Sequence, residues 1–204
     1  MLKYLDALTT LIFPRLCFAC GKKIIKGYLC FPCEGKIRVL PLKLGKALNK
    51  KVSVISVAQY CSPLSELIHL FKYKHCDYLG KYLGQIMAGH LNSASAWINS
   101  FDFIIPTPIH YLRRKERGYN QSLILARSLA KHFKIPLRDD IIYATKNRNQ
   151  QAKLKKSLRQ GNVADAFVVS QNVFNKKIIL VDDIYTTGST MRARTRDAKA
   201  AVAR

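Results

Sequence analysis

Hydrophobic positions along the chain fall into two kinds of pattern, and the first is the short apolar run. Residues 178–181 are four aliphatic residues in a row, and residues 101–105 are apolar apart from one aspartate. Such runs are typical of strands that are buried on both faces of a parallel sheet. Residues 52–60 have the β-branched content of a further strand. These three stretches predict the strands of a sheet.

The second pattern is the helical spacing of apolar residues. Within residues 63–73 the apolar side chains follow the i, i+3, i+4, i+7 spacing: Leu64, Leu67, Ile68 and Phe71. Residues 82–91 and a stretch that opens at residues 119–121 predict two more helices. Because helices alternate with buried strands, the pattern indicates an α/β fold in which helices flank a parallel sheet.

Two acidic residues and a hydroxyl-rich loop follow the run at residues 178–181. Asp182 and Asp183 stand at the carboxyl end of that predicted strand, the edge of an α/β sheet where ligands bind. The loop consists of Thr186, Thr187, Gly188, Ser189 and Thr190. Such a loop can surround a phosphate with N–H and O–H groups, while the carboxylates can bind sugar hydroxyls or Mg²⁺. The stretch predicts a phosphorylated-sugar site, and an ordinary strand-to-turn junction is the alternative.

The order of these residues also resembles the phosphoribosyl pyrophosphate (PRPP) signature of type I phosphoribosyltransferases. That signature has aliphatic residues, then two acids, then a Thr-Thr-Gly-x-Thr loop. The resemblance implies that Asp182 and Asp183 face the ribose hydroxyls and that residues 186–190 hold the 5-phosphate. We expect the two acids to serve the ligand and not the fold, so that the protein without ligand tolerates replacement of either by Asn.

Four cysteines form two C-x-x-C pairs near the start of the chain: Cys17, Cys20, Cys30 and Cys33. Each pair places two thiolates on one tight turn, and two such turns supply the four ligands of a closed tetrahedral Zn²⁺ site. Two structural disulfides or a redox pair are the alternatives. The absence of a secretory signal disfavours disulfides, and a redox pair would not need a second C-x-x-C pair. We expect a structural zinc ribbon, with Cys61 and Cys76 outside it as ordinary thiols.

Basic side chains gather in three segments of the sequence. Arg113, Arg114 and Arg117 follow the predicted strand at residues 101–105, where they could bind a pyrophosphate or form a solvated face. Residues 146–161 are basic and rich in amides, which favours a functional lid over a merely solvated loop. Residues 72–75, by composition, are interpreted as a solvated basic turn.

The charge balance points to anionic partners. The chain of 204 residues has 35 Lys and Arg against 12 Asp and Glu, a net charge of +23. Such a charge attracts nucleic acid first, then anionic membrane surfaces and phosphorylated small molecules, although solvation alone is the alternative. No apolar run approaches the roughly 20 residues that span a bilayer, so no membrane span is expected. Residues 1–14 are interpreted as a short amphipathic helix and not as a signal peptide, which favours a cytoplasmic location.

Several spaced motifs together resemble the ComF family, phosphoribosyltransferase-like proteins linked to natural competence for DNA uptake. The motifs are Phe71-Lys72-Tyr73, Pro106-x-Pro108, Arg113 or Arg114, Arg117-Gly118-Tyr119-Asn120-Gln121, Gln151-x-x-Leu154, Arg159, Asn162-Val163 and Ala166-Phe167, beside the cysteine pairs and the PRPP-type loop. The resemblance implies a type I phosphoribosyltransferase-like parallel sheet with a small N-terminal zinc ribbon. It further implies PRPP and Mg²⁺ as ligands, single-stranded DNA and a competence helicase-type protein as partners, and closure of the 146–161 lid over PRPP.

The resemblance also suggests a mechanism. Arg113, Arg114 and Arg117 would neutralise the leaving pyrophosphate with Mg²⁺, while Asp182 and Asp183 position the ribose. No residue identifies the acceptor, so transfer of the phosphoribosyl group stays open. The alternative is a basic accessory protein that binds single-stranded DNA and keeps the fold without catalysis.

Two domains are expected from these assignments. Residues 1–48 would form the N-terminal helix and the zinc ribbon, and residues 49–204 the phosphoribosyltransferase-like domain. The end of the chain departs from the family pattern, because no further strand is evident after Thr190. A missing edge strand would expose sheet backbone, which leaves two explanations: a truncated sequence, or a last strand supplied by a partner.

Overall fold

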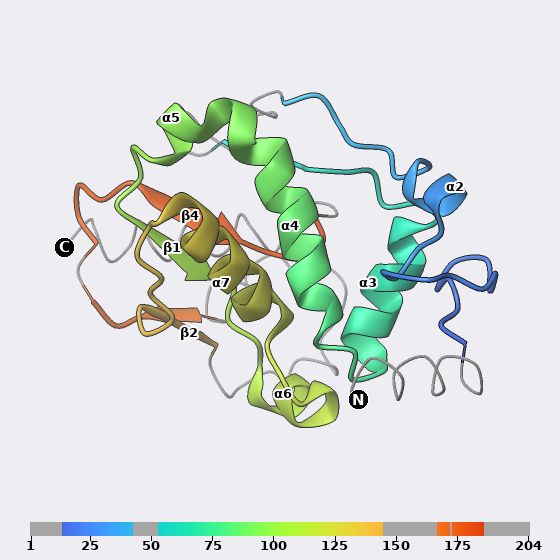
Figure 1. The fold of residues 1–204 in the computed structure, drawn as a ribbon. Coiled ribbons are helices and arrows are strands. Elements are labelled where there is room, and N and C mark those ends of the chain that lie inside the picture. Colours follow the sequence, from blue (N-terminus) through green and yellow to red (C-terminus); the bar gives the residue numbers. More distant parts are fainter. Residues whose placement is uncertain (1–13, 43–52, 145–166, 172, 186–204) are drawn as a thin grey trace, which may run out of the picture.

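The computed structural model describes residues 14–42, 53–144, 167–171 and 173–185 (Figure 1). Four predictions concern residues outside these ranges: the N-terminal helix, the 146–161 lid, the 186–190 loop and the end of the chain. At the centre lie two parallel strands, β1 (Phe103–Pro106) and β4 (Ile178–Val181). They pair in register, with Phe103 opposite Ile178 and Pro106 opposite Val181. The two apolar runs of the sequence therefore form the predicted parallel sheet.

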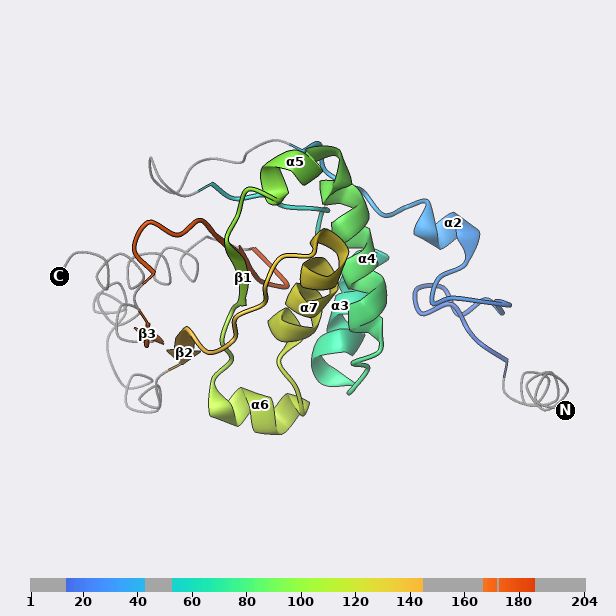
Figure 2. The same ribbon diagram turned by 60° about the vertical axis from the view of Figure 1, so that its left-hand side comes forward.

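Three helices lie together on one face of this strand pair (Figures 1 and 2). They are α3 (Leu64–Tyr73), α4 (Leu79–Leu91) and α7 (Gln121–Phe133). Helix α7 packs directly on β1 and β4, α4 packs on α7, and α3 packs on α4. A 3₁₀ turn, Asn92–Ala94, and the short helix α5 (Ser95–Ile98) lead from α4 back to β1. All three predicted helices are confirmed, with ends shifted by a few residues.

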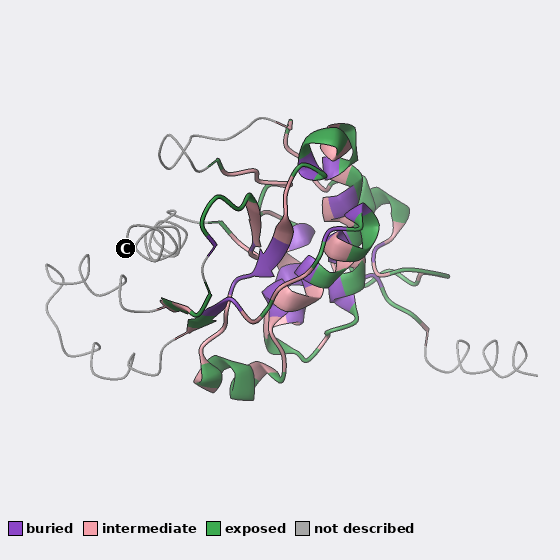
Figure 3. Cartoon of the chain, turned by 90° about the vertical axis from the view of Figure 1, so that its left-hand side faces the viewer, coloured by how far each residue is buried: buried purple, intermediate pink, exposed green. Residues whose placement is uncertain are grey.

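The hydrophobic core lies between these helices and the strands (Figure 3). Its fully buried side chains include Leu67 and Phe71 of α3, Leu79 of α4, Leu129 of α7 and Ile104 of β1. All four apolar positions that predicted α3 are buried, because their spacing places them on one face of the helix.

Helices α4 and α7 approach each other closely through two glycines of α4. A Cβ atom added at Gly80 would lie 2.4 Å from Cγ2 of Ile124, and one added at Gly84 would lie 2.3 Å from Cβ of Ser128. These distances are shorter than van der Waals contact, so any side chain at either position would push the helices apart. The close approach brings α7 over the strands and fixes its N-terminus near their carboxyl ends.

A small antiparallel pair forms a second sheet, and its apolar side chains pack against Ile105 of β1. It consists of β2 (Ile142–Ala144) and β3 (Phe167–Val169) and has a separate apolar cluster that includes Ile105, Ile141 and Val173. The other edge of β1 is extended by a parallel bridge between Ile104 and Leu137.

The cysteine-containing segment folds against the helices. It contains the short helix α2 (Phe31–Glu34) and an antiparallel bridge between Leu16 and Lys23. The Tyr28 ring stacks on Tyr78 at 5.7 Å, and the Tyr82 hydroxyl of α4 donates to Oε1 of Glu34 at 2.6 Å. The buried residues of this segment and of α3 and α4 form one continuous apolar cluster.

One sequence expectation about an element is wrong, and one helix was not predicted. Residues 53–60 form no regular strand: they are extended, with one isolated bridge between Ala58 and Val39. The arginine-rich segment after β1 forms a helix, α6 (Tyr111–Arg117), which begins after a His110 cap and is capped at its end by Gly118. Within the described residues, no helix has the length and apolar character needed to cross a bilayer.

Candidate functional site

The carboxyl ends of β1 and β4 meet at one edge of the sheet. The backbone N–H of Thr107, just after β1, donates to the carbonyl of Val181 at 2.9 Å. Asp182 and Asp183 follow Val181 directly, so both carboxylates stand at the edge where the sequence placed them. Their neighbours come from two other segments, the start of α7 and the end of α3.

The start of α7 holds Asp182. The Asn120 side chain caps the helix by accepting from the N–H of Ser122 at 3.0 Å, and its Nδ2 donates to the Thr107 carbonyl at 3.0 Å. The buried Ser122 hydroxyl donates to Oδ1 of Asp182 at 3.0 Å. The same oxygen accepts from the N–H of Asp183 at 3.1 Å. A carboxylate is favoured here, because the N-terminus of a helix carries partial positive charge.

The end of α3 holds Asp183. Nζ of Lys72 lies 2.9 Å from Oδ2 of Asp183, and the two side chains are only 15% and 12% exposed. The expectation that Lys72 belongs to a solvated turn is therefore wrong, although its neighbours Lys74 and His75 are exposed. The ion pair neutralises one of the two adjacent carboxylates inside the protein.

The environment of Asp183 is unusual for a carboxylate. Burial raises the pKa of Asp183 above its ordinary value, the Lys72 ammonium opposes this, and the neighbouring charge of Asp182 adds to it. The guanidinium of Arg117 lies near enough to lower the pKa as well. The site therefore favours a cation or a hydrogen-bond donor at this carboxylate.

The Arg117–Gln121 motif ties α3 to α7. The Tyr119 hydroxyl donates to the backbone carbonyl of Phe71, and the two rings lie 5.6 Å apart. The Arg117 guanidinium lies 5.1 Å from the centre of the Tyr73 ring, and its Nη1 donates to Oε1 of Gln121 at 3.2 Å. These contacts fix the backbone on either side of Lys72.

The predicted cationic residues separate in the structure. Arg117 is half-buried, whereas Arg113 and Arg114 are exposed on α6, and their side chains make no hydrogen bond or ion pair with the described residues. A left-handed Gly118, with φ of +78°, turns the chain between α6 and α7. The other predicted site residues, Thr186 to Thr190, lie outside the described residues.

An apolar cavity of about 410 Å³ runs beside β4. Its lining includes residues 53–60, β4, and both Asp182 and Asp183. Within the described part of the chain, β4 pairs along a single edge, with β1.

The four cysteines of the two pairs come together as predicted. Their sulfur atoms all lie within 4.8 Å of one another, and Sγ of Cys20 is 3.6 Å from Sγ of Cys30. Zn–S bonds of about 2.3 Å in a tetrahedron require sulfurs about 3.8 Å apart, so the cluster fits such an ion. All six cysteines of the chain are free in this structure. The cluster can bind a metal ion such as zinc.

The pKa values of the clustered cysteines also favour a bound cation. Burial raises the pKa of Cys17, but N–H groups of Cys30, Cys20 and Ala19 donate to its sulfur and bring it down to about 6. A hydrogen bond with Cys30, together with burial, raises the pKa of Cys33 to about 12. Sulfurs this close cannot all ionise without a positive ion among them.

Comparison with known proteins agrees with this architecture. A family model of the phosphoribosyl transferase domain matches residues 120–202, a stretch that begins at the cap of α7 and includes both aspartates. Competence protein F of Haemophilus influenzae is 30% identical, over 86% of this chain and 80% of that protein. Competence protein ComFC of Bacillus subtilis is 33% identical, over 89% of this chain and 70% of that protein.

The chain belongs to the ComF family. A further relative within it, DNA utilization protein YhgH of Escherichia coli, is 27% identical over 89% of each chain. The fold is therefore that of a ComF protein: a type I phosphoribosyltransferase-like sheet with helices, preceded by a four-cysteine cluster. No solved structure matched the chain.

Sequence reasoning missed two residues of the site. Lys72 lies four residues after Ile68, so the helical spacing already placed it at the border of the buried face. Ser122 is the second residue of α7, and no sequence signal linked it to Asp182, because the two are sixty positions apart.

Proposed function

We propose that this ComF-family protein binds PRPP together with Mg²⁺ at the carboxyl ends of β1 and β4. The observation that carries the proposal is the pair Asp182 and Asp183, held at that edge by Ser122 and Lys72. The match to a phosphoribosyl transferase domain over residues 120–202 supports it, since that range also contains the hydroxyl-rich loop.

The residues present fit a hard divalent cation. Two adjacent carboxylates supply the oxygen ligands that Mg²⁺ prefers, and the Lys72 ammonium already stands in for a cation beside Asp183. When bound, Mg²⁺ would neutralise negative charge on the pyrophosphate of PRPP.

The chain's own residues orient the sugar and complete the charge balance. Asp182 and Asp183 would accept hydrogen bonds from the ribose hydroxyls and so fix the face that C1 presents. Arg117, whose charge acts on Asp183, would stabilise the pyrophosphate, with Arg113 and Arg114 contributing from the same helix, α6. If an acceptor is present, pyrophosphate departs with the electrons of the C1–O bond as the acceptor bonds to C1.

Titration calorimetry tests the proposal. PRPP added with Mg²⁺ should release or absorb heat with one site per chain, and chelation of Mg²⁺ should abolish or strongly weaken the signal. Absence of heat at millimolar PRPP with Mg²⁺ would overturn the proposal. A pyrophosphate-release assay with purines, pyrimidines and single-stranded DNA would then search for the acceptor.

A second candidate function is the binding of single-stranded DNA in natural competence. The net charge of +23 favours it, and so do relatives named competence protein and DNA utilization protein. In this role a competence helicase-type protein would be a fitting partner. Binding of an oligonucleotide that weakens steeply with salt, yet is unchanged in Asp182→Ala, is expected. Binding that is lost with the aspartate would instead assign DNA to the PRPP site.

We further propose that the cysteine cluster holds one structural Zn²⁺, because four thiol ligands leave no open position for chemistry. Six free cysteines favour a reducing compartment, which fits the cytoplasm.

A further inference from the structure

Lys72 supplies a positive charge beside the two adjacent carboxylates. Its ammonium is 2.9 Å from Asp183, and a lysine side chain that is only 15% exposed has lost much of its hydration. Such burial costs free energy unless a carboxylate compensates. We propose that Lys72 is the resident counter-ion of Asp183 and that a divalent cation must displace it to bind there. This inference rests on the proposed function, because it concerns the same carboxylates.

The surrounding contacts hold the backbone of Lys72 and leave its ammonium exchangeable. Tyr119 fixes the Phe71 carbonyl on one side, and Arg117 covers the Tyr73 ring on the other. The ammonium itself is a point charge on a flexible four-carbon stem, so it can leave the carboxylate without any movement of α3.

The charges nearby explain why a divalent cation and the Lys72 ammonium cannot both stay at Asp183. Asp182 and Asp183 carry at most two negative charges, and the Lys72 ammonium already lies 2.9 Å from Asp183, with the guanidinium of Arg117 held nearby on the Tyr73 ring. A divalent ion at Asp183 would therefore meet an ammonium at close range, and the repulsion must be relieved by movement of the more mobile group. Competition of this kind lowers the apparent affinity for the metal.

The ion pair between Lys72 and Asp183 keeps the site ready for its ligand. With Lys72 in place, two adjacent carboxylates stay assembled at the sheet edge without metal, and the site does not need to rearrange when the ligand arrives. The lysine thereby sets the metal affinity low, so that the ion binds firmly only when the phosphates of a ligand contribute further coordination.

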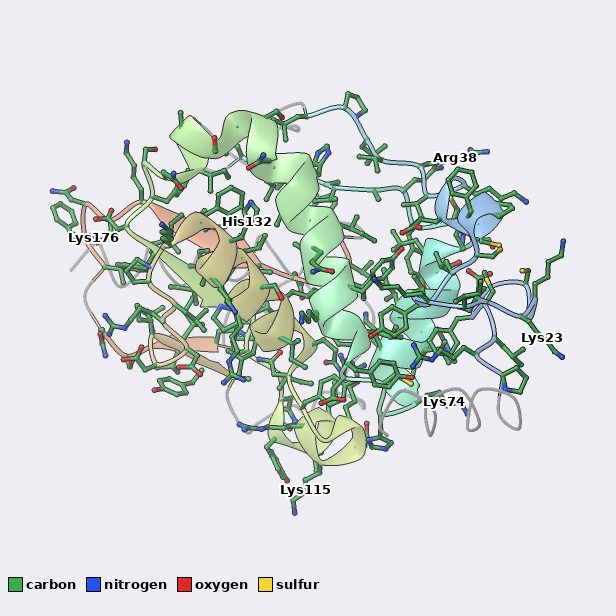
Figure 4. All side chains as sticks on the ribbon, in the orientation of Figure 1. Lys23, Arg38, Lys74, Lys115, His132 and Lys176 are labelled. Atoms are coloured by element: carbon green, nitrogen blue, oxygen red, sulfur yellow. The ribbon has the colours of Figure 1, made fainter. Side chains whose placement is uncertain are left out.

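Lys72→Met tests this with Mn²⁺ as the probe, in the absence of PRPP. Loss of the competing ammonium should tighten Mn²⁺ binding by about tenfold. Lys74→Met is the matched control, because it removes the same charge from an exposed side chain two residues further on (Figure 4), and it should change the affinity less than twofold. Asp183→Asn lacks the carboxylate in question, so the Mn²⁺ that it still binds measures binding elsewhere on the protein.

Lys72→Arg is a second variant that keeps the positive charge. Its guanidinium donates to a carboxylate through two N–H groups, so it should be harder to displace and should weaken Mn²⁺ binding several-fold.

A further test uses the parent protein and needs no variant. Acetylation of the Lys72 amine, followed by mass spectrometry, should speed up when Mn²⁺ is added, while acetylation of Lys74 should not.

The outcomes separate this inference from the proposed function. Equal or weaker Mn²⁺ binding by Lys72→Met, or an acetylation rate at Lys72 that Mn²⁺ leaves unchanged, overturns the role of Lys72 even if the parent binds PRPP with Mg²⁺. Failure of the parent to bind PRPP overturns the proposed function even if Lys72→Met binds Mn²⁺ more tightly.

Discussion

At the scale of single residues, the two adjacent aspartates differ in what supports them. Asp182 accepts hydrogen bonds from a hydroxyl and a backbone N–H, which an Asn carbonyl oxygen could also accept. Asp183 is paired with a half-buried ammonium, which an Asn cannot neutralise. The sequence led us to expect that either replacement is tolerated without ligand; with these contacts we now predict tolerance for Asp182 alone.

We predict unequal losses of stability for the two Asn variants in the absence of ligand. Asp183→Asn should lower the free energy of unfolding by about 1–3 kcal/mol, because it leaves the Lys72 ammonium without its carboxylate. Asp182→Asn should cost less than about 1 kcal/mol. Urea unfolding of both variants measures the difference, and equal losses would show that the Lys72 contact contributes nothing to the fold.

The residues of the site show where sequence reasoning succeeds. Asp182 and Asp183 were predictable because they directly follow a buried strand, and strand ends position whatever comes next. Lys72 was interpreted by composition alone, although the spacing of its own helix placed it beside the core. Arg113, Arg114 and Arg117 are close in sequence, but the helix they form directs the first two outward, and periodicity gave no signal for that helix.

At the scale of elements, the packing of α4 against α7 depends on glycine. Replacing Gly84 by Ala should destabilise the protein by about 1–3 kcal/mol, because the new methyl group would overlap the Ser128 side chain and separate the helices. Gly89→Ala in the same helix is the control. Nothing lies within 4 Å of its added Cβ, so it should stabilise the protein by about 0.5–1 kcal/mol.

Thermal or urea unfolding measures both glycine variants. Similar effects of the two, in either direction, would mean that α4 and α7 are not packed as closely as the structure has them.

The cysteine segment is joined to the larger domain, and this leads to a prediction about metal removal. Native mass spectrometry should find one zinc per chain. Chelation, or Cys30→Ser, should lower the melting temperature of the whole chain by about 4–10 °C, because the Tyr82–Glu34 hydrogen bond and the Tyr28 ring contacts are lost with the ribbon.

The control is Tyr82→Phe, which keeps the metal site but removes the hydrogen bond to Glu34. It should retain zinc and lose only part of that temperature difference. Protein that is zinc-free when purified without chelator, or a melting temperature unchanged by metal removal, would contradict the prediction.

Elements with their own apolar pattern were predicted well, and elements that depend on a partner were not. The strand β4 was predicted to the residue, and α3 to within one residue, because burial dictates their patterns. Residues 53–60 have strand-like composition, but a strand forms only where a neighbouring strand pairs with it, and here a single bridge does so.

At the scale of the whole molecule, the positive charge is distributed and not confined to the candidate site. Lys23, Lys115 and Lys176 lie at well-separated edges of the structure (Figure 4). A distribution of this kind attracts a polyanion without dictating one orientation, so sequence-independent and salt-sensitive binding of DNA is what the charge supports. The carboxylate pair, by contrast, is local and specific.

The central claim is that Asp182 and Asp183 bind a phosphorylated ribose with Mg²⁺, and a paired melt tests it most directly. PRPP with Mg²⁺ at about 100 times the dissociation constant should stabilise the parent by about 2.7 kcal/mol, a rise of about 5–10 °C in melting temperature. Asp182→Asn should melt near the parent without ligand and lose that rise. Asp139→Asn, which removes the same charge at an exposed position, should keep it. A rise that persists in Asp182→Asn, or a parent that millimolar PRPP and Mg²⁺ leave unchanged, would contradict the claim.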